Sequence, residues 1–483
     1  MADSNSKVIK NFIYNTSYEL LRLLAPLITA PYVSRVLGAD GVGVFSYTQS
    51  ISTYFVLLAA VGTTLYGQRE IAFVQDNPLE RTKVFWEIVC FRFITTLVCS
   101  IAFYIVFCRS GPYAVVYRIL LFEIAATAID ISWFFMGMEN FRITVIRNTL
   151  IKAAGIVMVF LLVKTPEDVP LYALCMTLPI ALGNLSLWIS AWRYLVNPSG
   201  RVFLDVPRHV RPILVLFIPQ VAIDVYVVLD KTMIGSLTPD ISEVGYYTQA
   251  QKIIKVLLVI VTSLGTVMLP AMSAAFAQGR NDDVQRGIQR AFRFALMLST
   301  ALVFGVCAIA DRFVPLFFGN GFEPVVMLMM LISPILLLIG ISNVIGKQYL
   351  LPTKQQKAFT ASVVTGAAVN FCLNLLLIPR FKALGASIAT VIAELSVTLV
   401  QLLYVRGHLP LKECFSPLAR YLPMGGVMYV ALRVLGRFLP SGIIPLALMV
   451  VMGGSIYIVL LALSKDEMLY LGAELIRSRN KSP

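Results

Sequence analysis

Charged and amide side chains lie within apolar helical stretches of this chain, where most membrane-spanning helices carry none. A charge at the centre of a bilayer costs at least about 2.5 kcal/mol, so it is kept mainly where it faces a wet cavity or a partner. We therefore expect these residues to line a hydrophilic cavity that binds a polar or charged passenger. The clearest set lies on two consecutive stretches between residues 221 and 266: Asp224, Asp230, Lys231, Lys252 and Lys255.

A second polar set lies near the N-terminus. Residues three or four positions apart share one face of a helix, and this spacing joins Asn15, Tyr18 and Arg22, with Glu19 alongside. We expect the two sets to face each other across one cavity, one helix pair coming from each half of the molecule. In the later set, the same spacing joins Gln220 to Asp224 and Gln249 to Lys252.

The depth of these residues favours an anionic passenger. With a rise of about 1.5 Å per residue, Arg22, Asp224 and Lys252 fall near the middle of a hydrocarbon core about 30 Å thick. Near this depth, lysine and arginine outnumber the carboxylates that could pair with them. An excess of cations suits a phosphate or pyrophosphate group. For any single one of these residues, the alternative to passenger binding is a structural ion pair, such as Asp224 with Lys252.

The composition identifies a polytopic membrane protein. The chain has 483 residues, of which 58% are hydrophobic and 14% are charged, and its mean hydropathy is +0.80. Soluble domains have about 45–50% apolar and about 25% charged residues, so soluble enzymes are excluded. A span needs about 20 apolar residues, and we expect an all-α fold of about fourteen transmembrane helices. The predicted spans are 12–37, 42–66, 83–108, 112–138, 143–164, 169–195, 209–237, 243–275, 287–310, 322–350, 356–378, 382–405, 417–438 and 441–464.

Lysine and arginine concentrate in the connections on one side of the predicted spans. Because cytoplasmic connections carry this excess, both termini are predicted to lie in the cytoplasm. The net charge of +14 is then a topology signal and an attraction to anionic lipid, not a sign of nucleic-acid binding. The outer connections are all too short to hold a catalytic domain.

A polar connection near the middle divides the predicted spans into two halves of six. An even number per half means that both halves point the same way, as in parallel transporter repeats. A short internal echo supports such a repeat: Gly43 matches Gly245 at an offset of 202 residues, while a rival offset of 200 aligns Tyr47 with Tyr247. The predicted parts are a first bundle at 1–196, a cytoplasmic linker at 197–208, a second bundle at 209–406, and two additional helices with a tail at 407–483.

Histidine and cysteine show no metal-binding pattern. The two histidines, His209 and His408, lie in basic connections, and none of the seven cysteines forms a CxxC pair. We therefore expect the cysteines to act as small buried hydrophobic residues. We predict no metal site, no other cofactor and no disulfide framework.

Three motifs occur in order along the chain. They are Pro-Tyr-Val-Ser-Arg-Val-Leu-Gly at 31–38, Asp-Ile-Ser-Trp-Phe-Phe-Met-Gly-Met-Glu-Asn-Phe at 130–141, and Asp-Lys-Thr-Met-Ile-Gly at 230–235. Together they resemble bacterial polysaccharide repeat-unit flippases of the Wzx type, within the multidrug/oligosaccharidyl-lipid/polysaccharide flippase superfamily. The residues that carry the resemblance are Arg35, Asp130, Trp133, Gly137, Glu139, Arg147, Asn148, Asp230 and Lys231.

The resemblance implies both a fold and a function. Such proteins have two six-helix bundles around a central cavity, often with two extra helices. Their passenger is an undecaprenyl-pyrophosphate-linked oligosaccharide, which alternating access carries across the bacterial cytoplasmic membrane for O-antigen, capsule or exopolysaccharide assembly. The resemblance further implies coupling to a gradient of H+ or Na+. Membrane lipids and a polysaccharide polymerase with its chain-length machinery are expected partners.

For such a passenger, the polar residues of the spans fall into three roles. Glu19 or Asp224 is expected to couple the ion, because the proton affinity of a buried carboxylate is easily shifted. Arg22, Lys152, Lys252 and Lys255 are expected to bind the pyrophosphate or acidic sugars. The residues expected to form hydrogen bonds with the glycan are Asn15, Tyr18, Gln220 and Gln249.

Other functions are weaker alternatives. A drug or cation antiporter of the same superfamily would need a net acidic cavity, which the excess of lysine and arginine argues against. A lipid II flippase has a passenger of more similar chemistry, but the signature at Asp130–Lys152 favours the polysaccharide flippases. A membrane polysaccharide polymerase tends to carry a long outer loop, and a scaffold would leave the buried charges unexplained.

Overall fold

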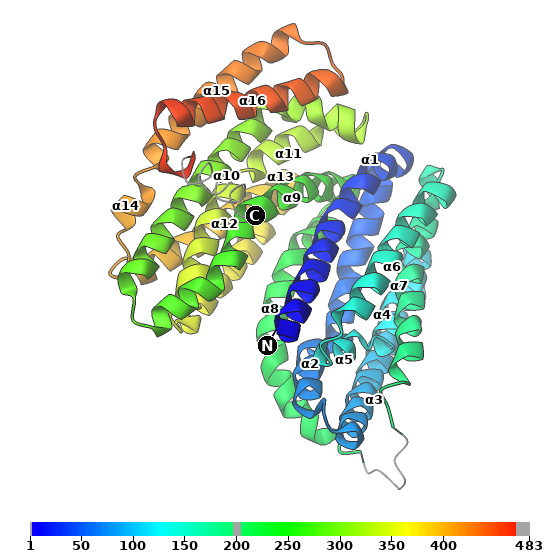
Figure 1. Cartoon of the computed structure of the whole chain (residues 1–483). Helices are drawn as coiled ribbons and strands as arrows, with labels where there is room; N and C mark the ends of the chain where they lie inside the picture. The colour runs from blue at the N-terminus through cyan, green and yellow to red at the C-terminus, as the bar shows by residue number, and fades with distance from the viewer. Residues whose placement is uncertain (1, 197–203, 470–483) are drawn as a thin grey trace. The chain divides into compact units, whose positions relative to one another are not determined.

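The computed structural model describes residues 2–196 and 204–469 (Figure 1). Within these ranges, side chains are described except at 2–24, 141, 218–227, 264, 266–267, 269–271 and 281. The described part is mainly helical and contains no strand, which confirms the predicted all-α class.

The chain forms two compact units, 1–245 and 246–483. The first unit contains α1 (Ala2–Ala60), α2 (Thr63–Val74), α3 (Pro78–Phe103), α4 (Ala114–Ala128), α5 (Ser132–Gly137), α6 (Phe141–Leu162), α7 (Val169–Ala191), α8 (Pro207–Leu237) and the start of α9 (Ser242–Ala277). The second contains the rest of α9, α10 (Asn281–Phe318), α11 (Pro324–Ile332), α12 (Ile335–Asn343), α13 (Gln356–Val405), α14 (Leu411–Phe415), α15 (Leu418–Phe438) and α16 (Ile443–Leu463). Short π-helical turns at Tyr104–Cys108 and Val344–Leu350 and a 3₁₀ turn at Pro166–Asp168 complete the helical elements.

Nine stretches of the described residues are long and apolar enough to cross a membrane. They confirm a multi-pass membrane protein, while the total of fourteen spans, the cytoplasmic termini and the division at 197–208 stay predictions.

Two long helices contain the breaks that the predicted spans require. The first break is at Gly38 in α1, with φ 68° and ψ −178°, and the second is at Lys382 in α13, with φ 50°.

Two predicted spans match candidate spans of the structure, at Ala114–Gly137 and Pro324–Leu350, but each contains a break in its helix. The span at 112–138 is interrupted after Ala128 and resumes as α5, and the span at 322–350 is interrupted between α11 and α12. The second interruption follows from Pro334, which has no N–H to continue the hydrogen-bond ladder. The first has a different cause, because Asp130 lies at the junction and its contacts hold the chain out of the helix, as described below.

Aromatic packing holds α3, α5 and α7 together beside this junction. The ring of Phe85 on α3 lies 5.7 Å from Trp133, 5.1 Å from Phe134 and 5.8 Å from Trp188, measured between centroids. Phe85, Trp133 and Phe134 are fully buried. Each buried aromatic residue contributes a large apolar area, so this cluster fixes the end of the first unit at which the polar residues converge.

The two C-terminal helices of the second unit pack on α10. The Tyr457 hydroxyl on α16 donates to the Met297 carbonyl at 2.9 Å. Nearby, the Tyr421 hydroxyl on α15 donates to Asp466 at 2.8 Å. Met428 and Met449 are buried in the same apolar cluster. The helices beyond residue 407 are therefore part of the core of this unit.

Two glycines of the first unit bring α1 and the start of α9 into backbone contact. A Cβ atom at Gly43 would lie 2.1 Å from the Ile241 carbonyl oxygen, and one at Gly245 would lie 2.2 Å from the Ala39 carbonyl oxygen. Neither position can hold a side chain, because such distances are far below van der Waals contact. The contact is reciprocal, since adding 202 to Ala39 and Gly43 gives Ile241 and Gly245. This reciprocity favours the offset of 202 residues over the rival of 200.

Candidate functional site

A carboxylate at the junction of α4 and α5 is held by two arginines. Asp130 Oδ2 lies 3.2 Å from Nη2 of Arg92 on α3, and its Oδ1 lies 3.8 Å from Nη2 of Arg147 on α6. The side chains of Arg92 and Arg147 are 3% and 11% exposed. One buried and one partly buried guanidinium group thus contact the same carboxylate.

The junction itself is fixed by the same residues. The Ser132 N–H donates to Asp130 Oδ1 at 3.0 Å, which turns the backbone directly after the carboxylate. The indole N–H groups of Trp133 and Trp188 donate to the carbonyls of Asp130 and Ile129 at 3.2 and 2.8 Å. Carbonyls that leave a helix ladder inside an apolar region need such partners. The sequence motif at 130–141 therefore builds a polar break within the helical bundle.

Asn184 extends the cluster to a fourth helix, and the sequence interpretation missed it. Arg147 Nη1 donates to Asn184 Oδ1 at 2.8 Å, and Asn184 Nδ2 donates to the Ala126 carbonyl at 2.9 Å. Asn184 is 4% exposed. A single amide within the apolar run of α7 was the available signal. The cluster, which we call the Asp130 network and define as Arg92, Asp130, Arg147 and Asn184, joins α3, the α4–α5 junction, α6 and α7.

A second polar cluster of the first unit contains the predicted phosphate-binding residue Lys152. Gln49 Nε2 on α1 donates to Glu123 Oε2 on α4 at 2.8 Å. Lys152 on α6 lies near enough for its charge to act on Glu123. Lys152 thus has an acidic neighbour within its own unit, so an anionic ligand would have to compete with Glu123 for it.

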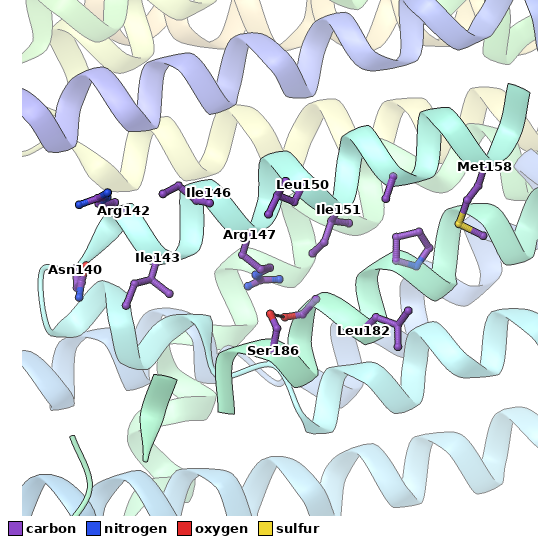
Figure 2. A pocket seen from close by; sticks show the side chains of 13 residues that line it. Asn140, Arg142, Ile143, Ile146, Arg147, Leu150, Ile151, Met158, Leu182 and Ser186 are labelled. Carbon is purple, nitrogen blue, oxygen red and sulfur yellow. Dashed lines mark hydrogen bonds between the residues drawn. The ribbon is translucent and has the colours of Figure 1, made fainter. Parts of the chain in front are cut away.

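A groove of about 710 Å³ runs between α6 and α7 beside the Asp130 network (Figure 2). Arg147 belongs to both the network and the groove. Figure 2 shows Asn140 and Arg142 towards one end of the groove and Met158 at the other. The lining residues are Asn140, Arg142, Ile143, Ile146, Arg147, Leu150, Ile151, Ala154, Met158, Pro179, Leu182, Gly183 and Ser186. The groove therefore has a cationic end and a long apolar remainder.

Three predicted binding residues lie on α9 in the second unit. Gln249 is fully buried, Lys252 is half-buried and Lys255 is exposed. The predicted face therefore runs from the interior of the unit to its surface. The other predicted binding and coupling residues have side chains outside the described part, so their roles stay predictions: Asn15, Tyr18, Glu19, Arg22, Gln220 and Asp224.

The remaining motif residues divide between core and surface. Trp133 and Gly137 are buried, and Asp230 on α8 is 5% exposed. The half-buried residues are Asn148 and Lys231, and the exposed ones are Arg35 and Glu139.

An ion-paired cluster at the start of α8 was not predicted, because His209 was assigned to a loop. His209 is instead a buried helical residue whose Nε2 lies 2.9 Å from Glu87 Oε2 on α3. The Tyr66 hydroxyl lies 2.7 Å from His209 Nδ1, and Arg208 pairs with Glu87 Oε2. The Asp205 N–H donates to Glu87 Oε1 at 2.7 Å. We call these five residues the Glu87 cluster.

Metal-ligand geometry and cysteine chemistry give no further site among the described residues. No group of three or more His, Cys, Asp or Glu side chains that could hold a metal ion is found within this part. Cys414 on α14 lies in the apolar core of the second unit, and burial raises the pKa of its thiol to about 11. This cysteine therefore stays protonated at neutral pH.

Comparison with protein families adds independent information. The family model described as "Polysaccharide biosynthesis protein" matches residues 8–276. The model described as "Lipid II flippase MurJ" matches residues 231–465. The two matches overlap at residues 231–276 and together extend from residue 8 to residue 465.

Individual proteins agree with the family models. The chain is 25% identical over 407 residues to a candidate O-antigen transporter of Escherichia coli (strain K12), covering 83% of this chain and 97% of that protein. A candidate O-antigen transporter of Shigella dysenteriae is 21% identical over 393 residues, which is 79% of this chain and 96% of that protein. The solved inward closed structure of the lipid II flippase MurJ has a TM-score of 0.74 at 14% identity, covering 95% of this chain and 100% of that one. That structure shows a shared fold.

Proposed function

We propose that this chain, which belongs to the polysaccharide biosynthesis protein family, flips undecaprenyl-pyrophosphate-linked oligosaccharides across the bacterial cytoplasmic membrane. The family match confirms the resemblance predicted from the three motifs and identifies a flippase rather than an enzyme. The passenger would serve O-antigen, capsule or exopolysaccharide assembly, and a polymerase with its chain-length machinery would take up the product.

The observation that carries the choice of an anionic passenger is the presence of several cationic side chains on apolar helices. Arg92 and Arg147 both contact the carboxylate of Asp130, and Lys252 and Lys255 lie on α9. A transporter of cationic drugs would instead concentrate carboxylates. Cations at this depth suit a pyrophosphate, which accepts several charge-assisted hydrogen bonds.

The transport cycle that fits this fold is alternating access, with both termini in the cytoplasm. Pro26 and Pro31 lie inside α1 and each removes a backbone hydrogen bond, so this helix can bend between states. We assign ion coupling, to H+ or Na+, to Glu19 or Asp224. We assign pyrophosphate binding to Arg22, Lys152, Lys252 and Lys255, and glycan contacts to Asn15, Tyr18, Gln220 and Gln249.

The direct test is flipping of a lipid-linked oligosaccharide in proteoliposomes. We expect Arg22→Ala and Lys252→Ala each to lower the rate at least tenfold, since the loss of a charge-assisted hydrogen bond costs about 1.5–3 kcal/mol. Lys357→Ala is the control, because Lys357 is an exposed cation at the start of α13. Undiminished flipping by both mid-membrane variants would exclude a cationic binding site built on these residues.

A second passenger, lipid II, is favoured by one observation, the match of residues 231–465 to the lipid II flippase model. Lipid II also carries a polyprenyl pyrophosphate, so the same cations would serve it. Offering both passengers to the same proteoliposomes separates the two functions. We expect faster flipping of the oligosaccharide-linked lipid, and preferential flipping of lipid II would reverse the assignment.

A further inference from the structure

We propose that the groove between α6 and α7 binds the polyprenyl chain of the passenger, with the phosphate held at its Arg142 end. The identity of the lipid rests on the proposed function, whereas the site rests on the structure of the first unit. The occupant is thus a long isoprenoid phosphate that lies along the outside of a helix pair.

The size and lining of the groove suit an apolar chain. Its volume of about 710 Å³ lies within the range of about 300–1,000 Å³ typical of small-molecule sites. Leu150, Leu182 and Ile146 are 64%, 57% and 44% exposed, so the apolar walls are open at the surface of the unit. In a bilayer, such walls contact lipid, so a lipid chain can enter the groove laterally from the membrane.

The polar groups of the groove include two cations. Arg142 and Arg147 both line it, with Asn140 near Arg142 at one end and Ser186 near Arg147 towards the middle (Figure 2). Arg142 is exposed and forms no hydrogen bond or ion pair with another residue whose side chain is described. A guanidinium group binds phosphate through two parallel hydrogen bonds. The charge of this end therefore complements a lipid phosphate.

The length of the groove distinguishes an isoprenoid from an ordinary phospholipid. From Arg142 to Met158 the helix rises about 24 Å at about 1.5 Å per residue. One leaflet contributes about 15 Å of a core about 30 Å thick. A phospholipid chain with its phosphate at Arg142 would end before Met158, whereas a polyprenyl chain fills the groove. The predicted cytoplasmic position of the Arg142 end matches the side on which the passenger is loaded.

The test measures binding of undecaprenyl phosphate, without glycan, to the purified full chain by native mass spectrometry. Ala154→Trp fills the groove, and Ala153→Trp is the matched control, because Ala153 is also exposed but does not line it. We expect at least a tenfold loss of affinity with Ala154→Trp and less than a twofold change with Ala153→Trp. Leu182→Trp on α7 is a second filling variant at an exposed position, should Ala154→Trp fail to fold.

The phosphate end has its own test. Arg142→Gln should weaken undecaprenyl phosphate binding at least fivefold and leave binding of undecaprenol unchanged. Phosphatidylglycerol with ordinary acyl chains should not compete at equal concentration. Equal competition by phosphatidylglycerol, or unchanged binding in the folded Trp variants, would overturn the proposal.

The failure of this site and the failure of the proposed function give different results. If wild-type protein flips the oligosaccharide-linked lipid and Ala154→Trp keeps wild-type binding, the groove assignment alone is wrong. If undecaprenyl phosphate binds as expected and the wild-type protein flips neither passenger, the groove assignment stands and the transport function is wrong.

Discussion

At the scale of single residues, Asp130 determines where four helical segments meet. Its carboxylate balances Arg92 and Arg147, and its backbone forms the α4–α5 junction. Breaking a buried ion pair costs more than the pair contributes, because the remaining charge loses its partner in an apolar environment. The two arginines would repel each other without it. This residue therefore has a structural role whether or not it meets the passenger.

Asp130→Asn keeps the size of the side chain and its acceptor for the Ser132 N–H but removes the charge. We expect a loss of about 3 kcal/mol, the lower end for a buried pair, because the Asp130 side chain is 22% exposed. A thermal denaturation midpoint at least about 5 °C lower should follow. Asp76→Asn, at an exposed connection, is the control. An unchanged midpoint would show that the two arginines are neutralised elsewhere.

At the scale of elements, the break in α1 depends on the backbone of Gly38. Its φ of 68° with ψ of −178° is a conformation essentially restricted to glycine. A Cβ atom at Gly38 would meet no neighbour within 4 Å, so any effect of a side chain there comes from the backbone alone.

Gly38→Ala should destabilise the protein by about 1–3 kcal/mol, the cost of a strained φ/ψ region. Gly426→Ala is a matched control within α15, where the added methyl group also meets no neighbour within 4 Å. There alanine should stabilise the helix by about 0.5–1 kcal/mol. Opposite signs in a denaturation assay of the two variants are the expected result. Equal effects would mean that α1 can continue as a straight helix through residue 38.

The helices were predictable to within a few residues, while their breaks and polar partners were only partly so. Long apolar runs determine elements such as α7 and α16. The break at Gly38 was predictable, because this glycine lies between two predicted spans. The break at Asp130 was hidden, because it depends on an indole N–H from Trp188, far along the chain. His209 looked like a loop residue, because its buried partner Glu87 comes from another helix. Pairings of this kind follow from tertiary packing, which residue spacing does not encode.

At the scale of the whole first unit, the Glu87 cluster fastens the start of α8 to α2 and α3. Glu87 accepts from the Asp205 N–H and pairs with His209 and Arg208, while Tyr66 contacts His209 from α2. Glu87 is fully buried, so its charge depends on these partners. The entry to α8 is thereby tied to the body of the unit by one carboxylate.

Glu87→Gln should loosen this attachment and leave the rest of the unit folded. The amide group keeps an acceptor for Asp205 but loses the ion pairs, so the Asp205 amide should exchange with deuterium at least about tenfold faster. Hydrogen exchange with mass spectrometry over residues 204–215 measures this. Glu80→Gln, at the exposed start of the same helix, should change nothing. Unchanged exchange in Glu87→Gln would assign the attachment to apolar packing.

The contact between Gly43 and Gly245 has an evolutionary consequence. Two identical subunits around a two-fold axis form reciprocal contacts: residue i of the first touches residue j of the second, and residue j of the first touches residue i of the second. A gene duplication that fused two such subunits would leave this pattern within one polypeptide. In such an ancestral gene, a single glycine codon would have specified both sides of the contact. The present chain has two glycines there, and a side chain at either one would force the two backbones apart.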